Sequence, residues 1–302
     1  GHSHGHSHVP ADYGRAFVIA VLLNTGFVIV EVACGFLANS TALLADAWHN
    51  LSDVLGLLLA WGAAVLSRRV PSGRYTYGLR GSSILAALAN AVFLLVACGA
   101  IAWEALLRLS QPPEVAGTMV TLVACVGIVV NGISALLFVK GSGEDMNIRG
   151  AYLHMAADAA VSLGVVVTGV IMATTGWFWL DPVSTLVIVA IIVYGTWQLL
   201  LQSLQLALSA VPRHIDVAIV ETYLRQCPGV TDVHDLHIWA MSTTESALTV
   251  HLVMPDGYPG DVVVDGIRHT LRERFMVSHS TLQVEQGTTE HVCCLHAAPR
   301  VN

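Results

Sequence analysis

The stretch TALLADAWHNLSDVLGLLLA, residues 41–60, decides how this chain of 302 residues folds. It has the length and apolar character of a helix that crosses a bilayer, which needs about 20 residues, yet it contains His49 and Asp53. A charge at the bilayer centre costs at least ~2.5–3.5 kcal/mol on insertion scales. The i, i+4 spacing of these residues places them one turn apart on one helix face. The stretch therefore predicts a membrane-spanning helix with a functional polar face.

The composition of the whole chain supports this interpretation. Hydrophobic residues make up 55% and charged residues 12%, about half of the roughly 25% found in soluble domains. The net charge of −7 and the lack of a basic stripe argue against nucleic acid as a partner. Long apolar runs predict six transmembrane helices, at about 15–37, 42–66, 82–107, 116–139, 150–174 and 182–208.

Changes in polarity along the chain predict four segments. They are a His-rich N-terminal segment (1–14), the six-helix transport domain (15–209), a small soluble α+β domain (210–290) and a Cys/His-containing tail (291–302). Within the soluble domain we expect a helix, two strands, a helix and a strand, at 214–226, 232–241, 246–254, 260–275 and 280–286. This α-β-β-α-β order predicts helices packed on one face of a small sheet.

Basic residues set the expected orientation of the spans. Six spans place both chain ends on one side, and the loops on that side contain Arg15, Arg68, Arg69, Arg74, Arg80, Lys140, Arg149 and Arg213. The opposite loops contain only Arg108. Because cytoplasmic loops carry the excess of Lys and Arg, we expect both termini and the soluble domain to lie in the cytoplasm.

A second polar pair repeats the first. The predicted fifth span contains YLHMAADAAVSLG, residues 152–164, in which His154 and Asp158 again stand i, i+4. Two helices that each offer one imidazole and one carboxylate supply the four ligands of tetrahedral zinc, and a dication would neutralise both carboxylates. The alternatives are two separate structural hydrogen bonds or a proton relay. Asp46, one turn before His49, either orients that imidazole or faces a water layer.

Three motifs resemble the cation diffusion facilitator family of zinc/proton antiporters. They are LNTGFVIVEVACGFLANSTALLADAWHNLSD (23–53), RGAYLHMAADAAVSLG (149–164) and VHDLHIWAMS (233–242). The His–Asp pair on both helices resembles the zinc-selective branch, and the short loop KGSGEDMN (140–147) resembles bacterial members of the inner membrane. The resemblance implies a homodimer in the lipid bilayer, alternating access, zinc as cargo with cadmium or other divalent cations as further substrates, and protons as counter-ions.

The same resemblance implies a metallochaperone-like cytoplasmic domain that binds regulatory zinc. The implied ligands are His234, His251 and Glu285, with Asp261 as a bridge and His279 as a substitute for the histidine that some relatives carry where this chain has Gln283. Strand alternation conflicts with this set, because His234 shares a face with Leu236 and Ile238 while His237 lies opposite. We keep His234, which opens the strand, and expect His237 to make a structural hydrogen bond.

Cys293, Cys294 and His296 in the tail are further candidate zinc ligands, unless the tail is simply a disordered end. Two other functions compete with transport. An intramembrane metallo-hydrolase is disfavoured because the sequence has no HExxH motif and no spare carboxylate to act as base. A membrane metal sensor would not need intact His–Asp pairs on both helices. We therefore expect a transporter and not an enzyme.

Overall fold

The computed structural model describes residues 11–67, 71–139 and 146–288. These divide into two compact units. The first is drawn from residues 1–58 and 89–198, and the second from residues 59–88 and 199–302. Each unit is described by itself below, and three long helices contribute residues to both.

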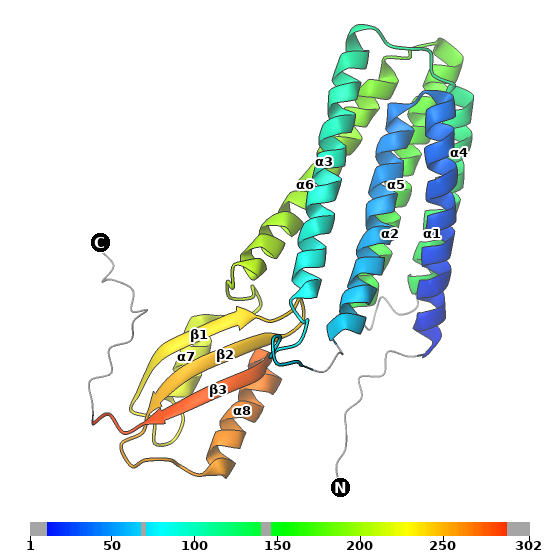
Figure 1. The fold of residues 1–302 in the computed structure, drawn as a ribbon. Coiled ribbons are helices and arrows are strands. Elements are labelled where there is room, and N and C mark those ends of the chain that lie inside the picture. The colour runs from blue at the N-terminus through cyan, green and yellow to red at the C-terminus, as the bar shows by residue number, and fades with distance from the viewer. Residues whose placement is uncertain (1–10, 68–70, 140–145, 289–302) are drawn as a thin grey trace. The chain divides into compact units, whose positions relative to one another are not determined.

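Six long helices match the six predicted spans, with ends that differ by a few residues. They are α1 (Ala11–Ala38), α2 (Thr41–Ser67), α3 (Ser82–Ser110), α4 (Gly117–Val139), α5 (Met146–Thr175) and α6 (Leu180–Ala207) (Figure 1). Among the described residues, α1 and α3 to α6 each contain a stretch long and apolar enough to cross a membrane. Helix α2 contains Asp46, His49 and Asp53 and falls outside that group. The prediction of a six-helix membrane domain is confirmed.

The first unit has a buried apolar core and also exposes large apolar side chains on its surface, as expected for a protein surrounded by lipid. Each of the six helices contributes buried apolar side chains to one core, among them Phe27, Leu43, Leu94, Val120, Val165 and Ile188. Helix α4 packs against both α1 and α5 (Figure 1). Other large apolar side chains, such as Val96 and Leu136, are exposed at the surface of the helices. Exposure of such side chains carries no free-energy penalty when they face hydrocarbon, because lipid tails are as apolar as a protein core.

A fully buried carboxylate joins the start of α2 to the start of α6. Asp181 accepts hydrogen bonds from the Ser40 hydroxyl (2.5 Å), the Thr41 backbone N–H (2.8 Å) and the Thr41 hydroxyl (2.8 Å). It thus satisfies donors at the N-terminus of α2, where the helix dipole also favours a negative charge. Asp181 therefore has a structural explanation that needs no ligand.

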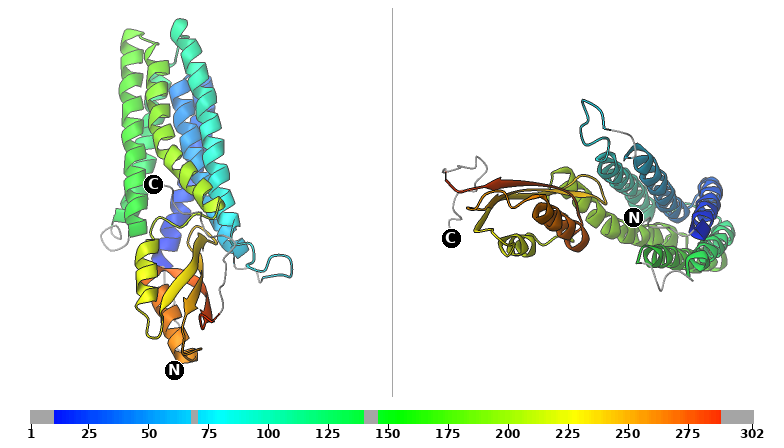
Figure 2. Two further views of the ribbon diagram at one scale, coloured as in Figure 1. Left: turned by 90° about the vertical axis from the view of Figure 1, so that its left-hand side faces the viewer. Right: turned by 90° about the horizontal axis from the view of Figure 1, so that it is seen from below.

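The second unit contains a three-stranded sheet with two helices. After α7 (Val217–Arg225) come β1 (Asp232–Ala240), β2 (Ser246–Val253), α8 (Asp261–Phe275) and β3 (Val277–Glu285). Strand β2 is central, antiparallel to β1 and parallel to β3. Helices α7 and α8 cover one face (Figure 2), where Leu248, Val250 and Leu252 are buried. The α-β-β-α-β prediction is confirmed, and alternation places His251 on the opposite face.

An irregularity in β1 resolves the conflict over His234. The pairing of β1 with β2 shifts register between His234 and His237, and Asp235 within the bulge has φ +52°. Val233 before the bulge and Ile238 after it are both buried against the core. The extra residue reverses the alternation between them. His234 therefore lies on the open face, where it pairs in register with His251.

Close helix packing in the first unit makes one glycine of α5 sensitive to substitution. A Cβ on Gly169 would lie 2.6 Å from the Thr121 hydroxyl and 3.0 Å from the Thr121 backbone nitrogen on α4. We expect Gly169→Ala to lower the free energy of unfolding by about 1–3 kcal/mol, because this overlap outweighs the better helix propensity of alanine. Thermal unfolding of the detergent-solubilised protein measures the change.

Gly164→Ala is the matched control, because a Cβ there would meet nothing within 4 Å. Gly164 lies on the same helix, so this variant should be as stable as the parent protein or slightly more stable. Equal loss of stability in both variants would contradict close packing at Gly169.

Candidate metal centres

The first candidate centre lies where α2 meets α5. His49 and Asp53 come from α2, and Asp158 comes from α5. His49 Nε2 stands 3.2 Å from Asp158 Oδ1 and 3.7 Å from Asp53 Oδ2. The side chains of Asp158, His49 and Asp53 are 5%, 18% and 26% exposed. The gradient shows that the group is enclosed at Asp158 and more accessible at Asp53.

The spacing of this group suits a small divalent ion. Zinc bonds of about 2.0–2.1 Å place two ligand atoms of a tetrahedral site about 3.3 Å apart. The two measured separations lie on either side of that value. Two carboxylates facing one imidazole also form an acceptor-rich group, which a dication would balance in charge. The residues present therefore fit a zinc ion.

The other predicted ligand of this centre is His154. Its backbone lies in α5, one turn before Asp158, so the two residues share a helix face. The side chain of His154 lies outside the described part of the structure. The structure thus brings together three of the four predicted residues, and the fourth remains a prediction.

Further polar groups continue from this centre into the helix bundle. Asp46 is fully buried, which excludes the alternative that it faces a water layer. It contacts the Ser162 hydroxyl at 3.4 Å and lies beside Glu31, which accepts a hydrogen bond from Asn50 at 3.1 Å. These contacts connect α1, α2 and α5 behind the candidate ligands.

The second candidate centre lies on the open face of the sheet. Glu285 Oε2 stands 3.1 Å from His234 Nε2, and Glu285 Oε1 stands 2.8 Å from His251 Nδ1. The two imidazole rings meet edge to face, with centroids 5.0 Å apart. Each residue comes from a different strand, so only the folded sheet brings the three together. Within the described residues, this group and the one at His49 are the two clusters with metal-ligand spacing.

The carboxylate of this second centre is held in its ionised form. Partial burial acts to raise the pKa of Glu285, but hydrogen bonds with His234 and Gln283 and the attraction of His251 lower the pKa below its ordinary value. A metal ligand must be deprotonated, so Glu285 is ready to bind a cation at neutral pH. One ligand atom from each of the three residues lies within 4.8 Å of the other two, and the ligand atoms of a tetrahedral zinc site stand roughly 3.3 Å apart.

The structure does not bring Asp261 or His279 into this group. Asp261 begins α8 and accepts a hydrogen bond from the Tyr258 hydroxyl at 2.5 Å. On β3, Gln283 is the register partner of His251, whereas His279 is the register partner of Ala247. His279 therefore lies four residues along the strand from the position beside His251. At ~3.3 Å per residue that is a separation of about 13 Å. Cys293, Cys294 and His296 lie outside the described residues.

Sequence reasoning missed Asp235. Its carboxylate stands 2.8 Å from His237 Nε2 and 3.5 Å from His251 Nε2. A signal for it was present in the sequence, since strict alternation places His234 on the same face as Leu236 and Ile238. A polar residue that breaks the alternation in this way indicates a bulge. The expected structural hydrogen bond of His237 is present, with Asp235 as its partner.

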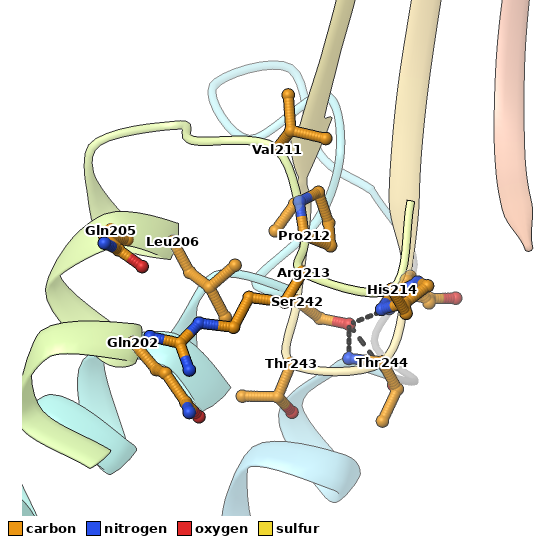
Figure 3. Close-up of a pocket in the computed structure, with 12 residues that line it drawn as sticks. Gln202, Gln205, Leu206, Val211, Pro212, Arg213, His214, Ser242, Thr243 and Thr244 are labelled. Atoms are coloured by element: carbon orange, nitrogen blue, oxygen red, sulfur yellow. Dashed lines mark hydrogen bonds between the residues drawn. The ribbon is translucent and has the colours of Figure 1, made fainter. Parts of the chain in front are cut away.

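A pocket of about 170 Å³ lies in the second unit (Figure 3). The end of α6, the segment after it and the turn between β1 and β2 form its walls. In that turn the Ser242 hydroxyl accepts hydrogen bonds from the backbone N–H groups of Thr244 (3.2 Å) and Glu245 (2.9 Å). None of the clustered candidate ligands lines this pocket.

Comparison with known proteins agrees with this architecture. Residues 17–206 match the family model of the cation efflux transmembrane domain, and residues 212–287 match that of the cation efflux protein cytoplasmic domain. The chain is 36% identical to the metal cation efflux system protein CzcD of Cupriavidus metallidurans, over 96% of this chain and 91% of that protein.

Two further relatives are named for their metals. The zinc transporter ZitB of Escherichia coli is 36% identical, over 94% of this chain and 91% of the relative. The cadmium, cobalt and zinc/H(+)-K(+) antiporter of Bacillus subtilis is 30% identical, over 98% of this chain and 97% of the relative. Both family models and these full-length relatives support efflux of divalent cations by an integral membrane protein. The chain therefore belongs to the cation diffusion facilitator family of cation efflux transporters.

Proposed function

We propose that this protein exports zinc from the cytoplasm in exchange for protons, with cadmium as a further substrate. The cargo binds to His49, Asp53, His154 and Asp158. The observation that supports this proposal is the convergence of His49 and Asp53 from α2 with Asp158 from α5. A site with two imidazole nitrogens and two carboxylate oxygens binds zinc in preference to the harder ions manganese and magnesium.

Alternating access would use competition between zinc and protons for the same ligands. Imidazole titrates near pH ~6.5 and must be neutral to bind a metal. Zinc entering from the cytoplasm displaces protons from the ligands, the helices rearrange, and protons from outside displace zinc. The excess of basic residues in the loops on one side supports cytoplasmic termini in a bacterial inner membrane.

The cytoplasmic domain would bind zinc that is not transported. His234, His251 and Glu285 form a group of their own in the second unit, outside the six helices. We expect zinc bound there to report the cytoplasmic zinc level and to favour a homodimer through this domain. Tail residues Cys293, Cys294 and His296 remain candidate zinc ligands.

The coupling to protons is tested in proteoliposomes that contain a zinc-sensitive dye. With zinc outside and an acidic lumen, we expect uptake to be several-fold faster than without a pH gradient, because luminal protons release zinc from the site. Collapsing the gradient with an ionophore should remove the difference. Flux that ignores the gradient would exclude proton exchange, and no flux at all would favour the sensor.

Single substitutions test the membrane site. His49→Ala, Asp53→Ala, His154→Ala and Asp158→Ala should each reduce zinc flux at least about tenfold, because each variant removes one of the four bonds that hold the ion, and the two aspartate variants also remove one of the negative charges that balance it. Initial rates are compared at equal amounts of reconstituted protein. Glu104→Gln is the control, since Glu104 is half exposed and pairs with Arg108 away from the ligands. Normal flux in any one variant would remove that residue from the site.

Ligand chemistry should determine selectivity. His49→Asp replaces a nitrogen ligand by oxygen, and oxygen ligands favour manganese over zinc. We expect the ratio of manganese to zinc flux to rise in this variant, measured by competition in the same vesicles. A metal profile identical to that of the parent protein would show that another feature selects the ion.

A further inference from the structure

The imidazole of His251 lies between two carboxylates. Its Nδ1 stands 2.8 Å from Glu285 Oε1, and its Nε2 stands 3.5 Å from Asp235 Oδ2. The second oxygen of Asp235 stands 2.8 Å from His237 Nε2. Glu285, His251, Asp235 and His237 therefore form a continuous row on the open face of the sheet.

The two edges of the His251 ring have different partners and so different roles. Nδ1 faces Glu285, which also contacts His234, so a metal held by these three residues would take the Nδ1 lone pair. The proton of the neutral ring then resides on Nε2, which faces Asp235. A carboxylate at the far nitrogen of a metal-bound imidazole fixes the tautomer and the ring orientation and makes the ligand more basic.

The backbone at Asp235 is arranged to make this contact. Val233 faces the core, so strict alternation would turn Asp235 toward the core as well. The bulge between His234 and His237 prevents this, at the cost of a φ of +52°, a region that L-residues rarely adopt but aspartate tolerates. A bulge of this kind re-aims a side chain. Here it places a carboxylate next to a candidate ligand.

We propose that Asp235 is a positioning residue, which holds His251 in the orientation that binds metal and is itself held by His237. The inference rests on the proposed cytoplasmic zinc site. Asp235 does not need to touch the ion, because its carboxylate faces the opposite edge of the ring. The side chains of Asp235, His251 and Glu285 are each about one-fifth exposed, so water only partly screens the carboxylate from the ring.

The test uses the full-length protein in detergent, with His49→Ala and Asp158→Ala to remove binding at the membrane centre. Zinc is titrated against a chelating dye. Adding His251→Ala should abolish one class of bound zinc, which identifies the cytoplasmic site. If no class disappears, the proposed cytoplasmic site itself is wrong, and with it the role of Asp235.

When that class is present, Asp235→Asn should weaken its zinc affinity by about 10–100-fold, the usual effect of losing a carboxylate behind a metal-bound histidine. Asparagine keeps the size of the side chain and tolerates positive φ, so the melting temperature without metal should not change. With cobalt in place of zinc, the absorption spectrum of the site should shift, because the ring is no longer fixed. His237→Ala should weaken zinc binding in the same direction by a smaller factor.

Asp232→Asn is the matched control. Asp232 begins the same strand but pairs with Arg225. The zinc affinity of the Asp232→Asn protein should therefore equal that of the parent protein. An Asp235→Asn affinity within threefold of the parent would overturn the proposal while leaving the cytoplasmic site intact. A fall in the melting temperature without metal that matches the loss of affinity would also overturn it, because Asp235 would then act only on the fold.

Discussion

A charge inside a bilayer must be balanced by a partner, and this constraint governs the first unit of the protein. Asp181 meets it with hydroxyl and backbone donors at the start of α2, and Glu31 receives a hydrogen bond from Asn50. His49 meets two carboxylates, Asp53 and Asp158. Donors at the start of α2 explain Asp181 as part of the fold, whereas Glu31 receives its hydrogen bond from Asn50 and lies beside the buried Asp46. The arrangement at His49 places two carboxylates around one imidazole, and a divalent cation bound there would balance their charge.

Most of the fold follows from the sequence because its signals are local. A bilayer requires long apolar helices, so the runs of the sequence predict all six to within a few residues of their ends. The i, i+4 spacing places His49 and Asp53 on one face without any knowledge of the neighbouring helices. The contact between Asp158 on α5 and His49 on α2 depends on tertiary packing. In the sequence, only the second i, i+4 His–Asp pair suggested this contact.

The group on the sheet was harder to predict because a sheet brings residues together through the register of its strands. Strict alternation along β1 would place His234 on the core face, but the bulge at Asp235 places it on the open face. The position of His279 depends on how β3 pairs with β2, and that pairing places Gln283 beside His251 and Glu285 two residues further on. No local pattern contains that register, since one residue of shift moves every side chain to the other face.

Both candidate centres take their ligands from elements distant in the sequence, and this has a mechanical consequence. His49 and Asp158 are held by different helices, each of which keeps its own backbone hydrogen bonds whatever the other does. Sliding or tilting α5 against α2 therefore changes the distance between the ligands without breaking either helix. A site built within a single helix could not be opened in this way. Under the proposed function, ligands divided between two helices would bind the ion in one arrangement of the helices and release it in another, as a transporter requires.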